Sequence, residues 1–301
     1  MTTVLTEQRL GGRTEVLQAR RTAERDAAGR RARWNLLAYG ALTIAGLVAL
    51  VPFLYVISLS LKHTESLVTY PPEWIPNPPY FGNYVQMLTQ ALFPRWFLNT
   101  LVVAGAVTLI KLLIDSMAGY AFAKMDFPLK ESLFLAVLSM LMIPLVTTLI
   151  PLYLLVRAMG LQNTYPGIIL PGLAAPMGIF LMRTFMEQLP RDLENAARLD
   201  GASEPYIFAR IVLPLCKPGL VTLAIFTFMT QWVAFVWPLV IAPDPNMFLL
   251  TTGLNSFKAQ YRVNWGLVAA GMVLVLIPTA IAFVAFMRHF IAGSLAGALK
   301  Q

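Results

Sequence analysis

Long apolar runs separated by shorter polar segments make up most of this chain. Six runs with few or no charged residues stand out: 36–61, 97–120, 132–156, 166–182, 218–242 and 263–287. An α-helix needs about 20 residues to cross the ~30 Å hydrocarbon core of a bilayer. The runs are too long for the alternating strands of an outer-membrane barrel, so they predict six transmembrane helices.

The segment between the fourth and fifth runs, residues 183–217, has a different pattern, with five basic and five acidic positions. Asp192 is a suitable N-cap for a short helix that Gly201 would end. Helical spacing puts Leu193, Ala196 and Ala197 on one face of this helix. The same spacing directs the polar residues Glu194, Asn195 and Arg198 elsewhere.

A second short helix is predicted directly after Gly201. Ser203 can cap it, and Glu204 and Pro205 suit its first turn, where a carboxylate favours the helix dipole and proline loses no needed hydrogen bond. Its apolar stripe consists of Ile207, Phe208, Ile211, Val212 and Leu215. The pattern therefore predicts two helices joined at a glycine elbow, which can dock into a groove of another protein or lie on the membrane surface.

Composition supports a membrane protein and leaves little room for metal or thiol chemistry. The chain is 57% hydrophobic and 13% charged, with positive mean hydropathy. Such values fall in the integral-membrane class. Cys216 is the only cysteine, and His63 and His289 stand apart in the sequence. We therefore expect no internal disulfide and no Cys/His metal site.

The basic residues behind the net charge of +8 lie mostly on one side of the predicted membrane topology. Six spans with a cytoplasmic amino end place 18 basic residues inside, with Lys111 counted at the inner end of its helix, and five outside. The five are Lys62, Arg95, Arg157, Lys258 and Arg262. This asymmetry predicts that both termini are cytoplasmic. No aromatic residue is interleaved among the amino-terminal arginines, so we expect no nucleic-acid partner.

The predicted organisation is one membrane domain preceded by a tail. Residues 1–34 are basic and predicted to be a disordered cytoplasmic tail, and residues 35–301 are predicted to form the transmembrane domain with its cytoplasmic loop at 183–217. The first apolar run begins too far into the chain, and is too long, for the core of a signal peptide. We therefore expect it to be retained as an anchor.

One segment resembles a known family. "LENAARLDGASEPYIFARIVLPLCKPG" is similar to the cytoplasmic EAA loop of binding-protein-dependent ABC importer permeases, specifically the smaller permease subunit of the maltose-type carbohydrate uptake family. The segments "FPRWFLNTLVVA", "AGYAFAKMDFP", "MIPLVTTLIPLYLLVRAMGLQNTYPGIILP", "WGLVAAG" and "FIAGSLAGALK" extend the resemblance over roughly residues 35–300. The loop signature is more specific than a lone glycine motif.

The resemblance implies an all-α fold of six transmembrane helices, the type I ABC importer permease fold, in a prokaryotic inner membrane. It implies several partners: a second, homologous permease subunit, two ATP-binding cassette subunits that bind ATP and magnesium, and an extracytoplasmic solute-binding protein. It also implies that the EAA loop couples to the ATPases. The positions carried over for this role are Asn195, Ala196, Ala197, Asp200, Gly201, Ile211, Leu213 and Pro214.

Two departures from the family pattern concern function. Asn195 stands where the family has the glutamate that names the motif, with Glu194 one place earlier, and an amide replaces a carboxylate that could pair with an ATPase arginine. In the fifth run, Val233 and Ala234 replace a polar pair that is frequent in the family. The sugar path is predicted along Gln231, Trp232 and Trp237, whose aromatic and polar groups suit sugars, although both indoles also suit packing.

Other classes of function make different demands on the sequence. No segment matches the Gly-x4-Gly-Lys-Ser/Thr phosphate cradle, so we expect no ATP hydrolysis by this chain and no cofactor in it. A transporter driven by an ion gradient would use intramembrane ionisable residues, and Lys111 and Asp115, at i, i+4 spacing, are more simply a structural ion pair. A membrane enzyme would need a nucleophile with a base, which the spans do not offer. A non-sugar solute such as glycerol phosphate remains an alternative cargo.

Overall fold

Helices are the only regular elements in the described part of the chain. The computed structural model describes residues 34–63, 74–89, 92–257 and 264–298. Two compact units, Met1–Val56 and Ile57–Gln301, make up the molecule. The first unit contains most of a 27-residue apolar helix, Trp34–Ser60, which confirms the first predicted helix. The predicted amino-terminal tail lies outside the described residues.

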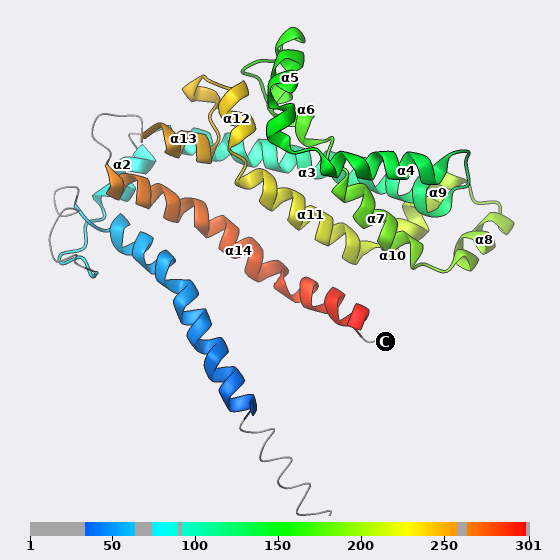
Figure 1. Ribbon diagram of the computed structural model, residues 1–301, viewed down its shortest axis with the longest axis horizontal. Coiled ribbons are helices and arrows are strands. Elements are labelled where there is room, and N and C mark those ends of the chain that lie inside the picture. Colours follow the sequence, from blue (N-terminus) through cyan, green and yellow to red (C-terminus); the bar gives the residue numbers. More distant parts are fainter. Residues whose placement is uncertain (1–33, 64–73, 90–91, 258–263, 299–301) are drawn as a thin grey trace, which may run out of the picture. The chain divides into compact units, whose positions relative to one another are not determined.

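The second unit is organised around one long helix, α3 (Phe93–Lys124), which follows the short α2 (Gly82–Thr89). Helix α3 packs against α7 (Met177–Glu187) and α11 (Lys217–Trp232), as Figure 1 shows. Gly119 permits a close approach, because a methyl group at this position would lie 2.7 Å from Cβ of Met182 on α7. Thirty-two residues of α-helix extend about 48 Å, enough to cross a bilayer.

The third predicted helix is interrupted. It consists of α4 (Lys130–Ser139), the 3₁₀ turn η2 (Met140–Met142) and α5 (Leu145–Ala158). The two parts meet at an angle of 103°. Ile143 has φ −87° and ψ 115°, an extended conformation typical of the residue before a proline, and Pro144 follows it. A continuous helix over 132–156 was therefore the wrong prediction, although both parts are helical.

The fourth and fifth apolar runs are also broken. Helix α6 (Tyr165–Gly172) meets α7 at 47°, with Pro176 immediately before α7. Helix α11 ends at Trp232, and α12 (Val236–Ile241) begins after an irregular stretch, residues 233–235. These breaks leave backbone N–H and C=O groups without partners in their own helix. Such groups need hydrogen-bond partners from other elements.

The chain ends in η4 (Pro245–Met247), α13 (Leu250–Ser256) and α14 (Trp265–Ala298). Two described helices, Trp34–Ser60 and α3, are long and apolar enough to span a membrane alone, and up to five spans result if each of three bent pairs is one span. Residues 265–281 of α14 form a further, shorter apolar helix. The number six and the cytoplasmic placement of both termini stay predictions.

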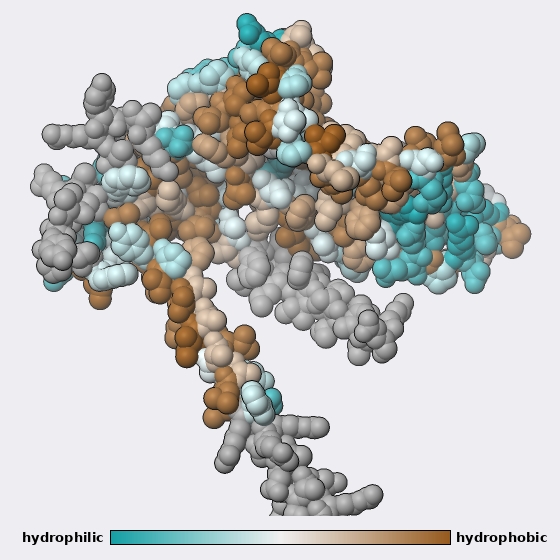
Figure 2. All heavy atoms as spheres, viewed as in Figure 1, coloured by the Kyte–Doolittle hydropathy of each residue, from teal (hydrophilic) through white to brown (hydrophobic). Residues whose placement is uncertain are grey.

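Polar side chains in the second unit gather at one end of the helix bundle. Figure 2 shows hydrophilic residues over the end that carries α8 (Arg191–Leu199) and α9 (Glu204–Ile207), whereas the surface over α5 is mainly hydrophobic. Under the hydrophilic end lies a core cluster that includes Tyr120, Met182, Met186 and Ile207. This end is the region of the predicted coupling loop.

Candidate functional site

Two short helices joined by a glycine turn form the predicted loop. Helix α8 runs from Arg191 to Leu199, and α9 runs from Glu204 to Ile207. Gly201 has φ +81°, a left-handed conformation that L side chains rarely adopt. The Gly201 amide donates to Arg198 O (3.0 Å) and the Ala202 amide to Ala197 O (2.9 Å), which is a Schellman cap. The predicted glycine elbow is present.

The start of each helix differs in detail from the prediction. Helix α8 begins two residues earlier than expected, with Pro190 rather than Asp192 at its N-cap, and Asp192 lies in the first turn. Ser203 does occupy the N-cap of α9, but its side chain accepts no capping hydrogen bond. Carboxylates in the first turn of each helix, including Glu204, still favour the positive end of the helix dipole.

After α9 the chain forms a wider helical segment and then turns into α11, where the fifth apolar run begins. Residues Phe208–Val212 form a π-helical segment, η3, and α10 (Leu213–Leu215) follows. Ile207 and Val212 are buried, whereas Leu215 is exposed, so the predicted apolar stripe is only partly buried. The segment Glu204–Leu215 then meets α11 at 79°. Ile211, Leu213 and Pro214 thus lie between the elbow and the first turn of α11.

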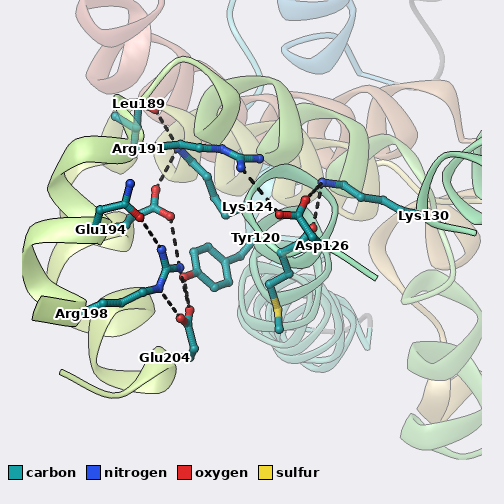
Figure 3. A network of polar contacts seen from close by, with 11 residues as sticks. Tyr120, Lys124, Asp126, Lys130, Leu189, Arg191, Glu194, Arg198 and Glu204 are labelled. Carbon is teal, nitrogen blue, oxygen red and sulfur yellow. Dashed lines mark hydrogen bonds and ion pairs between the residues drawn. The ribbon is translucent and has the colours of Figure 1, made fainter. Parts of the chain in front are cut away.

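A buried ion pair connects α8 to α3. Glu194 Oε1 lies 2.8 Å from Lys124 Nζ, and both side chains are at most 3% exposed. Lys124 Nζ also donates to Leu189 O at 2.7 Å, as Figure 3 shows. The sequence pattern had placed Leu193 on one helix face with Ala196 and Ala197, and Glu194 elsewhere, without saying which face packs against the protein. In the structure Glu194 is the buried residue of α8, whereas Leu193 is 46% exposed.

A second polar link joins α9 to α3, one helical turn before Lys124. The Tyr120 hydroxyl donates to Glu204 Oε2 at 2.8 Å. Arg198 completes the network by donating from Nε to Glu204 Oε1 (2.6 Å) and from Nη1 to Asn195 Oδ1 (3.0 Å). Hydrogen bonds from Arg198 and then Tyr120 lower the pKa of Glu204 below its ordinary value. Figure 3 shows these side chains converging between α3 and the loop.

The outer surface of the elbow is concave and partly apolar. A pocket of about 560 Å³ lies between the two short helices. It is lined by Ala197, Asp200, Gly201, Ala202, Ser203, Tyr206 and Ile211. Leu199 is 91% exposed at the turn, and Tyr206 is 56% exposed at the pocket wall. Four of the predicted coupling positions therefore share one hollow, while Asn195 and Ala196 are exposed on α8 beside it.

Comparisons with known proteins agree with this arrangement. Residues 116–293 match the family described as binding-protein-dependent transport system inner membrane component. The arabinooligosaccharides transport system permease protein of Halalkalibacterium halodurans is 37% identical over 256 residues, 84% of this chain and 92% of the relative. The trehalose transport system permease protein of Mycobacterium tuberculosis is 34% identical over 84% of this chain and 93% of its own length.

This chain belongs to the family of binding-protein-dependent importer permeases. It is a multi-pass protein of the inner membrane and a permease of an ABC importer. Among solved structures, a bacterial ABC transporter involved in the import of the acidic polysaccharide alginate superimposes with a TM-score of 0.77. That chain is 22% identical, and the match covers 85% of this permease and 96% of that chain, which confirms the type I permease fold.

Lys111 and Asp115 are the only charged residues inside the predicted spans of the permease, and they link α3 to a neighbouring helix break. Lys111 Nζ lies 2.8 Å from Asp115 Oδ2, and the two side chains are 5% and 1% exposed. Lys111 Nζ also donates to Ala175 O at 2.9 Å and approaches Leu173 O at 3.5 Å. These carbonyls belong to the break between α6 and α7. The pair thus supplies hydrogen bonds that the broken helix cannot make for itself.

The three predicted substrate-path residues of the permease occupy separate environments. The indole of Trp232 is 2% exposed and donates to Val275 O at 3.3 Å. Trp237 belongs to another core cluster and donates to Gly167 O at 3.2 Å. Gln231 is half-buried, and a methyl group on Gly172 of α6 would come within 3.4 Å of its Nε2 atom. The structure does not bring the three side chains into one site.

The sequence pattern alone missed the residues that attach the loop to α3. Lys124 and Tyr120 are separated from their partners by 70 and 84 positions, so no local periodicity relates them. A weak signal was available, because Tyr120 and Lys124 are four residues apart and therefore on one face of α3. The exposed side chains of Leu199 and Tyr206 were missed as well, and Leu199 stands between the charged residues Arg198 and Asp200.

Proposed function

We propose that this permease imports a carbohydrate, powered by separate ATPase subunits that grip residues 191–215. The two ATPase subunits bind ATP and magnesium, a second homologous permease subunit completes the translocation pathway, and an extracytoplasmic solute-binding protein delivers the cargo. Closure of the ATPases on ATP moves the loop as a rigid body. The membrane helices then alternate between inward-open and outward-open arrangements.

The observation that carries the coupling role is the surface of the elbow. It combines a 560 Å³ hollow with the exposed side chains of Leu199 and Tyr206 on a turn that Gly201 and its Schellman cap hold rigid. A protein partner can insert a side chain into such a hollow and bury the apolar residues at its rim. Since burial of apolar area favours association, the elbow suits a protein groove better than bulk water.

The carbohydrate assignment rests on the relatives. Their names specify arabinooligosaccharides, trehalose and, for a permease of Streptomyces coelicolor that is 30% identical over 274 residues, diacetylchitobiose. Of the predicted path residues, Gln231 has the position best suited to cargo, because it is half-buried at the end of α11 beside Gly172 of α6. The two tryptophans would support the path by packing behind it.

An ion-gradient mechanism lacks a free relay in the described spans. Lys111 and Asp115 neutralise each other, and Lys111 additionally binds carbonyls of the α6–α7 break. A proton relay needs a group that gains and loses its proton during the cycle. Removing the charge of either partner here would leave the other buried and unpaired, which is costly. The pair therefore supports ATP-driven transport over the ion-gradient alternative.

A substitution at the elbow tests the coupling role. Gly201→Trp forces a bulky residue into left-handed backbone and fills the hollow, so we expect loss of ATPase association or of ATP-dependent uptake in the reconstituted transporter. Gly160→Trp is the matched control, since Gly160 also has a positive φ (+71°) with nothing within 4 Å, but lies at the end of α5. Normal uptake by the Gly201→Trp transporter would contradict the proposed coupling role of the elbow.

The cargo is tested on the solute-binding protein of the same transporter. A thermal-shift screen would compare arabinooligosaccharides, trehalose and diacetylchitobiose with glycerol 3-phosphate. Stabilisation by a sugar at micromolar concentration supports the carbohydrate assignment, because a ligand that binds only the folded state raises the unfolding temperature. Stabilisation by glycerol 3-phosphate alone would assign the permease to polyol phosphates.

A further inference from the structure

The coupling loop is attached to the rest of the permease at two polar points on α3. At the first, Lys124 binds Glu194 of α8 and the carbonyl of Leu189. At the second, Tyr120 binds Glu204 of α9. We refer to these five residues as the α3 clamp. Since Tyr120 and Lys124 occupy successive turns of one helix face, a single face of α3 holds both halves of the elbow.

The buried part of the clamp cannot separate without a large penalty. Lys124 Nζ is the only polar partner of Glu194 Oε1 among the described residues, and neither side chain reaches much water. Arg198 approaches the other carboxylate oxygen only to 3.8 Å. Separating a buried ion pair leaves two charges desolvated, so motion of α8 and motion of the α3 end are tied together.

Helix α3 is also attached to other elements of the second unit at its amino end. Near its amino end, Trp96 Nε1 donates to Pro245 O (2.8 Å) and Asn99 Nδ2 to Asn246 O (2.9 Å) and Phe248 O (3.0 Å). Between its ends it packs along α7 and α11. One rigid helix therefore joins the coupling loop, two other helices and the loop around η4.

We propose that the α3 clamp is the point where the coupling loop transmits its movement to the membrane helices, with Lys124, Glu194 and Tyr120 as positioning residues. This inference rests on the proposed function, because it presumes that ATPases move the loop. It assigns Glu194 an internal role: the carboxylate next to Asn195 faces α3 and is not presented to a partner. Contact with the ATPase belongs to the exposed rim of the elbow instead.

The test measures a nucleotide-driven movement remote from the loop and needs no knowledge of the cargo. Phe235, 36% exposed in the break after α11, is replaced by cysteine in a Cys216→Ala background and labelled with a water-soluble maleimide. The intact transporter is compared with and without magnesium-ATP and vanadate. The readout is the ratio of the two labelling rates. A separate Leu199→Cys reporter in the same background records contact with the ATPase by crosslinking.

Three variants are compared with the parent. Lys124→Met/Glu194→Met replaces the buried ion pair with apolar side chains, a change that often leaves stability intact. Tyr120→Phe removes one hydroxyl. Glu187→Gln is the matched control, because among the described residues Glu187 pairs only with Arg183 of its own helix, at 2.7 Å. We expect the double variant to keep its Leu199→Cys crosslink but to lower the nucleotide effect by about fivefold or more, Tyr120→Phe to lower it less, and Glu187→Gln to leave it unchanged.

Each outcome has one meaning. Parental nucleotide effects in both the double variant and Tyr120→Phe would overturn the clamp, and so would a parent that crosslinks to the ATPase but shows no nucleotide effect at Phe235→Cys. If the double variant does not assemble, Tyr120→Phe alone decides. Absence of the Leu199→Cys crosslink in the parent would instead contradict the proposed function, so the two failures are distinguishable.

Discussion

At the scale of single residues, burial decides which groups of the loop are available for chemistry. Glu194 and Cys216 are both buried, whereas Asn195, Leu199 and Asp200 are exposed. The Glu194 carboxylate is therefore an internal structural group. Helical spacing could not identify this group, because it shows which residues share a face but not which face packs against the rest of the protein.

The buried cysteine gives the first residue-scale prediction. Burial raises the pKa of the Cys216 thiol to about 11, so at pH 8 only about one thiol in a thousand is ionised, and the thiolate is the reactive form. We expect slow maleimide labelling of the native permease and rapid labelling after denaturation, measured by mass spectrometry. Stoichiometric labelling of the native protein within minutes would contradict this burial.

At the scale of elements, the sequence predicted those features that depend on neighbouring residues alone. The elbow depends on Gly201 and its immediate neighbours, so it was predictable from a short stretch. The 103° turn before α5 was not predicted, because the apolar run 132–156 has the composition of one continuous helix. The signal for the turn was Pro144, since a residue before a proline, here Ile143, disfavours helical backbone. The α3 clamp required knowledge of which helices are neighbours, which periodicity does not contain.

The packing of α3 on α7 gives the element-scale prediction. Gly119→Val adds side-chain volume where a methyl group already lies 2.7 Å from Met182 Cβ. Overpacking of this kind costs about 1–3 kcal/mol, so we expect a lower unfolding temperature in detergent. Gly105→Val on the same helix is the control, because nothing lies within 4 Å of a methyl group there. Equal effects of the two substitutions would contradict the observed helix contact.

At the scale of the whole molecule, the proposed coupling depends on how the helices are connected. Its membrane helices are broken at several points, and the long α3 connects those pieces to a polar loop at one end. The sequence contains no phosphate cradle of the Walker type, and we propose that the energy for movement enters through a contact with another subunit. The elbow is the surface of the described chain that best suits such a contact.

The most direct test of this central claim is site-specific crosslinking from the elbow tip. Leu199→Cys, in a Cys216→Ala background, would carry a maleimide-benzophenone probe in membranes that contain the complete transporter. Ile75→Cys, 84% exposed and predicted to be extracytoplasmic, is the control. We predict that Leu199→Cys crosslinks to the ATPase subunit and that Ile75→Cys does not. Crosslinks from Leu199→Cys to lipid alone would contradict the account.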